Sequence, residues 1–166
     1  KMDAYTEQIV SKIPTPNDTI KKVGIGVLAI LAALIVFLVT NLFGLSAIGL
    51  LLAGGCIYGG FYFITCMDVE YEYIITNGEI DIDKIIAKRK RKRLITAKAS
   101  TFEKFGLLKE ADQSGSFTTV LASCGISSNE YYADFKHTTH GQVRLIFSPN
   151  EKVLEALKPY ISRTIR

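Results

Sequence analysis

The stretch VEYEYIITNGEIDID, residues 69–83, contains two alternating segments separated by the dipeptide Asn77-Gly78. Alternation of aromatic or β-branched residues with polar ones is typical of a half-buried strand, and Asn-Gly between two such segments predicts a two-residue β-hairpin. Pairing around that turn places Thr76 opposite Glu79. One face of the hairpin is then apolar and is the expected core; it carries Tyr71, Tyr73, Ile75, Ile80 and Ile82.

The opposite face of this hairpin carries the acids Glu70, Glu72, Asp81 and Asp83. The register sets Glu72 directly across from Asp83, and like charges in that position destabilise a sheet unless a base neutralises them. The next segment, KRKRKRLIT at residues 88–96, is expected to fold back as a third strand. Because successive side chains of a strand point to opposite faces, only part of this basic run can meet the acids.

The basic run therefore has two interpretations that the sequence leaves open. Its side chains bind anionic headgroups at a membrane surface, where each base contributes about 1 kcal/mol, or they only neutralise the neighbouring acids. The candidate lipid-binding residues are Lys88, Arg89, Lys90, Arg91, Lys92 and Arg93.

The rest of residues 68–166 has the size of a small independent domain. Residues 117–124, 130–136 and 142–147 predict three more strands, and residues 100–116 predict either a seventh short strand or a helical turn. A capping box starting at Ser148 predicts a final amphipathic helix. Its apolar stripe is Val153, Leu154, Leu157, Tyr160 and Ile161.

Upstream of the strands, no Asp, Glu, Lys, Arg or His occurs in residues 23–67. A membrane crossing needs roughly 20 apolar residues in a helix, so this stretch predicts a transmembrane hairpin with helices at about 23–42 and 45–66. The turn falls near residues 41–46, where the polar and flexible residues of the stretch gather. A cleaved signal peptide is the competing interpretation, but its apolar region is usually only ~7 to 15 residues long.

Charge asymmetry predicts the orientation of the hairpin. Lys21 and Lys22 precede the first helix, the basic run follows the second, and the turn carries no base. Both termini are therefore expected in the cytoplasm of a multi-pass cell-membrane protein. Residues 1–22 form a cytosolic segment, in which Met2 to Ile13 is either a short amphipathic helix or a frayed tail, ended by Pro14 and Pro16.

Small residues gather in the second helix, where Gly55 and Gly59 lie one turn apart. Such spacing lets helices approach closely in lipid. The preferred interpretation is that these glycines pack the second helix on the first, and the alternative is association with another copy or another membrane protein.

Motifs that would indicate catalysis are weak in this chain. Gly24 to Ala29 matches a dinucleotide-binding pattern but follows no strand, and His137 and His140 have no ligand pair at metal-site spacing. The three cysteines are interpreted as small packing residues. We therefore expect no enzyme activity, no cofactor and no metal. The net charge of residues 68–166 is only +3 (16 bases minus 13 acids), which argues against nucleic-acid binding.

The layout also resembles a known family. A membrane hairpin, a strand-rich domain opening with YIITNGEIDI at residues 73–82, a basic second hairpin and a closing helix resemble the bacterial pleckstrin-homology-like (PH-like) membrane proteins. The chain is similar as well to small two-helix proteins of unknown function from Gram-positive anaerobes. It has Ala87-Lys88 where the commoner bacterial pattern has a glycine. The resemblance implies an α+β fold, in which a PH-like β-barrel of about six or seven antiparallel strands is capped by a C-terminal helix, and no catalysis.

Together these observations predict a membrane-anchored adaptor whose cytosolic domain binds anionic lipid headgroups or a protein at the inner leaflet. The alternative is an assembly or regulatory subunit that acts through helix packing of its transmembrane hairpin, with a membrane protein or a second copy as partner.

Overall fold

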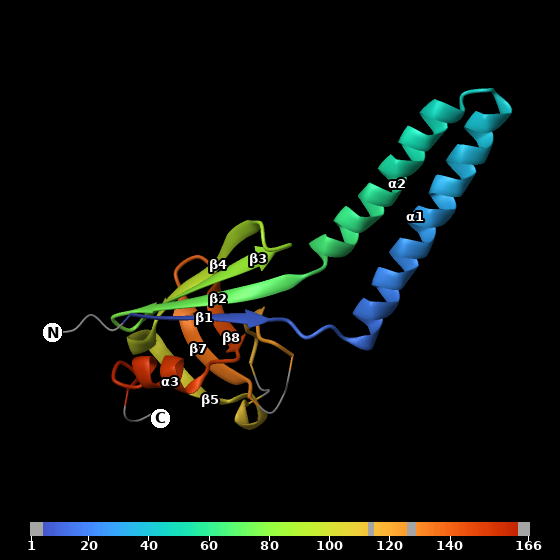
Figure 1. Cartoon of the computed structure of the whole chain (residues 1–166). Helices are drawn as coiled ribbons and strands as arrows, with labels where there is room; N and C mark the ends of the chain where they lie inside the picture. The colour runs from blue at the N-terminus through green and yellow to red at the C-terminus, as the bar shows by residue number, and fades with distance from the viewer. Residues whose placement is uncertain (1–4, 113–114, 126–128, 163–166) are drawn as a thin grey trace. The chain divides into compact units, whose positions relative to one another are not determined.

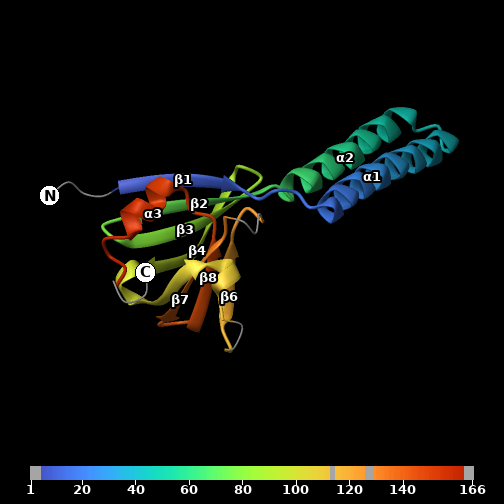
Figure 2. The same cartoon turned by 90° about the horizontal axis from the view of Figure 1, so that it is seen from below.

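The computed structural model describes residues 5–112, 115–125 and 129–162, which divide into two compact units. One unit, Pro14–Asp68, is a pair of helices. The other joins the residues up to Ile13 with those from Val69 onward, and it is built from strands and one α-helix (Figures 1 and 2). The strand domain therefore begins before the helices and resumes after them, so two covalent links connect the units.

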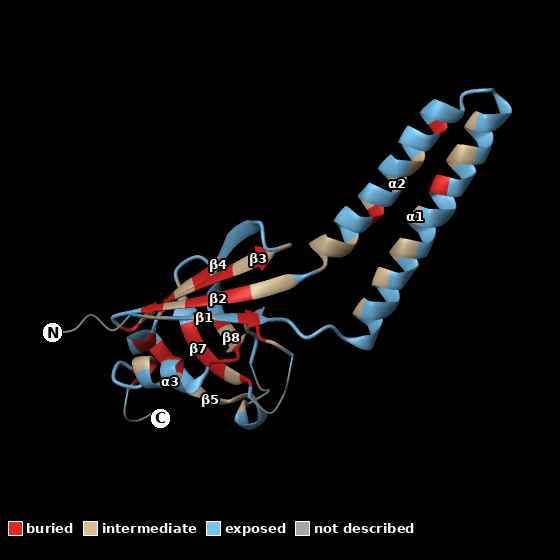
Figure 3. Cartoon of the chain, in the orientation of Figure 1, coloured by how far each residue is buried: buried red, intermediate tan, exposed pale blue. Residues whose placement is uncertain are grey.

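Helices α1 (Pro16–Leu42) and α2 (Ser46–Cys66) are both long and apolar enough to span a membrane. Most residues of both helices are exposed (Figure 3), and they include many large apolar ones. The expected start of the first helix at Val23 is wrong, because Pro16, expected to end a helix, begins this one. Proline suits the first helical position, where its missing N–H needs no partner. Thr15 completes the cap, since its hydroxyl accepts from the Asp18 N–H and its own N–H donates to the Asp18 carboxylate.

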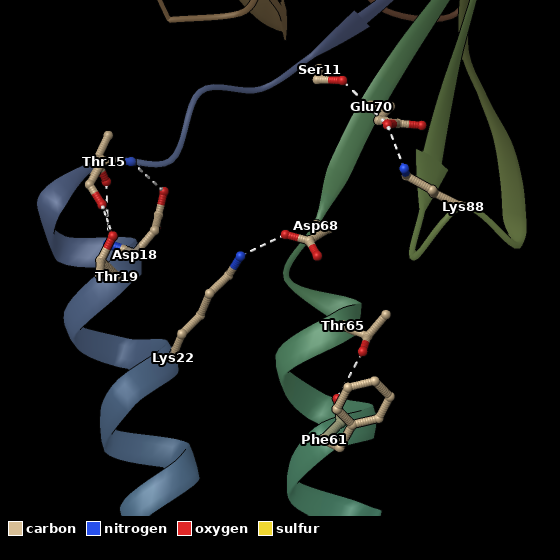
Figure 4. Close-up of polar contacts among 10 residues, drawn as sticks. All are labelled: Ser11, Thr15, Asp18, Thr19, Lys22, Phe61, Thr65, Asp68, Glu70 and Lys88. Atoms are coloured by element: carbon tan, nitrogen blue, oxygen red, sulfur yellow. Dashed lines mark hydrogen bonds and ion pairs between the residues drawn. The ribbon is translucent and has the colours of Figure 1, made fainter.

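The two helices approach each other at two glycines. A Cβ added at Gly49 would overlap the Thr40 side chain, and one added at Gly60 would overlap Ala29. At the opposite end from the turn, Lys22 Nζ lies 2.6 Å from Asp68 Oδ1 (Figure 4). Close approach at small residues and one ion pair thus hold the hairpin together.

The first sheet contains four antiparallel strands in the order β1-β2-β3-β4. They are β1 (Tyr5–Ser11), β2 (Val69–Thr76), β3 (Glu79–Ile86) and β4 (Lys90–Lys98). The predicted hairpin and its register are confirmed, with Thr76 opposite Glu79 and Glu72 opposite Asp83. Asn77 and Gly78 have φ of 50° and 81°, as such a tight turn requires.

Strand β1 corrects the expectation of a surface helix or frayed tail before the membrane helices. Tyr5–Ser11 pairs with β2, and Val10 is buried in the core, whereas residues 2–4 lie outside the described residues. A seven-residue segment is too short to form a stable helix alone. The open edge of β2 instead satisfies its backbone groups.

The second sheet has the order β5-β7-β8-β6. Its strands are β5 (Phe102–Leu107), β6 (Thr118–Ala122), β7 (Tyr131–His137) and β8 (Gly141–Phe147). Both options for residues 100–116 occur, because β5 is followed by a 3₁₀ turn at Leu108–Glu110. The expectation of a wholly antiparallel barrel needs one correction, since β6 runs parallel to β8.

Buried residues gather on the strands of both sheets (Figure 3). The core that they form contains the five side chains predicted from the first hairpin. The Tyr73 hydroxyl links the sheets by donating to the Ala122 carbonyl and accepting from the Ser148 N–H. Helix α3 (Glu151–Leu157) packs on β1 and β2 and buries Val153 and Leu157. Its N-cap is Asn150 rather than the expected Ser148.

Candidate functional site

The acids on the outer face of the first sheet are neutralised by two arginines of β4. Arg91 Nη1 lies 2.8 Å from Glu72 Oε2, while Nη2 donates to Oε1 at 3.0 Å. Arg93 Nη1 lies 2.7 Å from Asp81, and Arg93 Nε donates to Asp83. Two of the six predicted lipid-binding residues therefore have an internal electrostatic role.

Glu72 depends most on a neutralising base among these acids, because its side chain is only 1% exposed. Burial raises the pKa of its carboxyl group, Arg91 opposes that rise, and the neighbouring Glu7 and Asp83 reinforce it. Loss of Arg91 would leave a buried carboxylate without compensation.

The other four bases of the run form no close ion pair with these acids. Lys88, Arg89, Lys90 and Lys92 are all exposed. Lys88 Nζ lies 4.0 Å from Glu70, at the limit of an ion pair. The charged groups of the remaining three form no hydrogen bond or ion pair with any residue that the structure describes.

The register places some of these bases where they repel one another. Lys92 lies opposite Lys84, and Lys90 lies opposite Ile86, on the face of the hairpin that carries no acid from β3. The charged group of Lys84 also has no partner among the described residues. Like charges directly opposite each other destabilise a sheet, and a bound anion would reduce this repulsion.

The turn between β3 and β4 carries backbone strain. Ala87 and Lys88 have φ of 54° and 53°, a region that residues with a Cβ adopt at a cost of about 1–3 kcal/mol. The Arg89 N–H donates to the Ile86 carbonyl at 3.1 Å, which closes the turn. The missing glycine noted in the sequence is therefore replaced by two strained residues where the basic run begins.

This turn lies at the end of the first sheet from which both links to the helices leave. Val69, the first residue of β2, pairs with Ile86, and Glu70 pairs with Ser11, the last residue of β1. Figure 4 shows Ser11, Glu70 and Lys88 together. We call Lys84, Lys88, Arg89, Lys90 and Lys92 the basic tip.

The glycines predicted to pack the second helix on the first, Gly55 and Gly59, are not the glycines at which α1 and α2 come closest. A Cβ added at Gly55 or Gly59 would meet nothing within 4 Å, so neither residue is a point of close approach between α2 and α1. Gly49 and Gly60 have that role. Packing of Gly55 and Gly59 against another helix stays a prediction.

The histidines and the C-terminal cysteine of the weak chemical motifs contact neighbouring side chains. The rings of His137 and His140 stack with centroids 5.0 Å apart, and Cys124 Sγ lies 3.2 Å from Ser148 Oγ. Among the described residues, no group of three or more His, Cys, Asp or Glu side chains is placed to hold a metal ion.

The structure thus defines a class of protein in which two membrane-length apolar helices follow the first strand of a two-sheet domain closed by a helix, and the other strands come after them in the chain. A family described as Bacterial PH-like domain (DUF6106) matches residues 2–166. The chain belongs to this bacterial PH-like family, and the predicted PH-like fold is confirmed. Proteins with such domains are generally not enzymes. Comparison with curated proteins and with solved structures finds no match.

Two residues of the site, Lys84 and Ile9, were not predicted from the sequence. Lys84 precedes the basic run and becomes part of the tip through its pairing with Lys92, while Ile9 reaches the same end of the sheet from β1. The alternation of residues 5–11 was the available signal for β1, but it is also compatible with helical spacing.

Proposed function

We propose that this protein is a membrane-anchored adaptor whose PH-like domain binds anionic lipid headgroups through the basic tip. The observation that carries the proposal is the position of the tip, at the end of the domain where both links to the apolar helices leave. In this proposal both termini are cytoplasmic, and the tip approaches the inner leaflet of the cell membrane.

Charge and distance support this assignment. Each Lys or Arg near an anionic surface contributes about 1 kcal/mol, and the attraction extends over a Debye length of about 8 Å at physiological salt. The link from Ser11 to α1 is short, and the link from α2 to Val69 is shorter. Because the tether supplies proximity, weak intrinsic affinity of the tip suffices to dock the domain.

The test uses the full chain in nanodiscs of neutral phosphatidylcholine, with or without about one fifth anionic phosphatidylglycerol. Hydrogen exchange of residues 84–93 is measured across a salt series. We expect slower exchange with the anionic lipid and loss of this protection as salt shortens the Debye length.

The informative variant replaces Lys88, Arg89, Lys90 and Lys92 with serine and keeps Arg91 and Arg93, which neutralise the acids. A matched control removes the same charge at exposed lysines elsewhere, Lys98, Lys109, Lys136 and Lys152. Lipid-dependent protection is expected in the control and not in the first variant. Equal protection in both lipids for the unmodified chain would overturn the proposal.

A second candidate function, assembly through the helical hairpin, is favoured by the open surface beside Gly55 and Gly59. In that case, Gly55→Leu with Gly59→Leu abolishes co-purification of a membrane partner or a second copy, whereas the serine variant has no effect. Such bulky residues would occupy the space that a third helix needs.

A further inference from the structure

A pocket beside the basic tip combines features that a simple anion site does not need. It has a volume of about 490 Å³ and is lined by Ile9, Glu70, Ile85, Lys88, Arg89 and Arg91. That volume is in the range of small-molecule sites. We call it the headgroup pocket; it offers bases, one carboxylate and two apolar side chains to the same ligand.

The carboxylate is the distinguishing feature. Glu70 Oε1 accepts from Ser11 Oγ at 3.2 Å and lies 4.0 Å from Lys88 Nζ, and the Glu70 side chain is 20% exposed (Figure 4). An anion bound by Lys88 and Arg89 would be repelled by this acid. A ligand that carries a cation next to its phosphate would instead pair with both.

We infer that the headgroup pocket binds a phosphate ester that also carries a primary amine, the chemistry of an ethanolamine phospholipid. This inference rests on the proposed function, because it names the headgroup that the basic tip meets. The phosphate lies against Arg89 and Lys88, and the ammonium donates to Glu70 in place of Lys88. Ile9, which is 55% exposed, contacts the methylene groups of the ligand together with Ile85.

The same geometry discriminates between headgroups. A primary ammonium has three N–H donors, as the lysine ammonium has, whereas the trimethylated nitrogen of choline has none. The phosphate of phosphatidylglycerol is negatively charged, but its headgroup has no cationic group that could pair with the Glu70 carboxylate. The pocket therefore favours the ethanolamine headgroup over choline, while the surrounding bases respond to any anionic lipid.

The test again uses the full chain in nanodiscs, now with phosphatidylglycerol constant and phosphatidylcholine replaced by phosphatidylethanolamine. We expect hydrogen exchange of residues 84–93 to slow at least about threefold on this replacement. A change of this size corresponds to the free energy of one or two exposed charge contacts. Glu70→Gln should remove the response to phosphatidylethanolamine and preserve or increase the response to phosphatidylglycerol. The charge-matched control is Glu79→Gln. Glu79 begins β3, whereas Glu70 pairs with Ile85 near the end of that strand, so the control should leave both responses unchanged.

Each outcome separates this inference from the proposed function. A response to phosphatidylglycerol without one to phosphatidylethanolamine, or a Glu70→Gln chain that keeps the ethanolamine response, overturns the inference and leaves the proposed function standing. No response to phosphatidylglycerol overturns the proposed function. Protection by dissolved glycerophosphoethanolamine, with the chain in neutral detergent, would support the same chemistry and assign it to a soluble ligand, whereas protection confined to nanodiscs assigns it to the lipid.

Discussion

Replacing Arg91 with alanine should destabilise the PH-like domain, because Glu72 would lose the base that compensates its buried charge. The Glu72 side chain is 1% exposed, whereas the Arg91 side chain is 61% exposed. Removing one partner of a fully buried pair costs about 3–5 kcal/mol, but solvent screens the exposed arginine, so we expect about 1–2 kcal/mol.

The pH dependence of this loss has a defined sign. Burial already raises the pKa of Glu72 above its ordinary value of 4.5, and loss of Arg91 removes the influence that lowers it. A raised pKa in the folded state means that the folded chain binds more protons than the unfolded chain between the two pKa values. The destabilisation is therefore largest above the folded-state pKa and decreases as pH falls through it toward 4.5.

Urea unfolding of the full chain in neutral detergent, followed by tyrosine fluorescence from about pH 7 to about pH 5, measures the effect. Glu72→Gln in the Arg91→Ala background should recover most of the lost stability, because it removes the buried charge. An Arg91→Ala loss that is constant across this pH range, or that survives Glu72→Gln, would refute the electrostatic reasoning.

Two further substitutions test local features of the domain. Ala87→Gly should stabilise it by up to about 1 kcal/mol, because glycine adopts the observed φ of 54° without strain, and an unchanged or lower Tm would contradict this. Tyr73→Phe should cost about 1–3 kcal/mol in urea unfolding, because the Ala122 carbonyl and the Ser148 N–H lose a buried partner. Tyr5→Phe, which removes an exposed hydroxyl, is the matched control and should have little effect.

The parts of the fold that could be predicted are those encoded over short distances. Asn77-Gly78 determines a hairpin turn locally, and alternation from Tyr71 to Ile82 then specifies both the core face and the pairing of Glu72 with Asp83. The apolar run predicts two membrane-length helices from composition alone. The strand at Tyr5–Ser11 could not be predicted in the same way, because its partner β2 lies beyond both helices.

The candidate site shows the same division. A basic run beside an acidic hairpin is visible in the sequence, but the bases that meet the acids depend on the length of the turn. The turn contains Ala87, Lys88 and Arg89, so Arg93 pairs with Asp83. A turn shorter by one residue would have placed Lys90 and Lys92 on the acidic face instead, since a one-residue slip reverses the facing of every side chain.

The sequence by itself determined the membrane-length hairpin, the first β-hairpin and the presence of excess positive charge, because each depends on residues that are neighbours in the chain. Only the tertiary structure decided that β1 completes the first sheet and that Arg91 and Arg93 are held by acids. It also decided that the basic tip lies where both links to the helices leave the domain. These features depend on strand register and on contacts between distant segments, which local propensity does not specify.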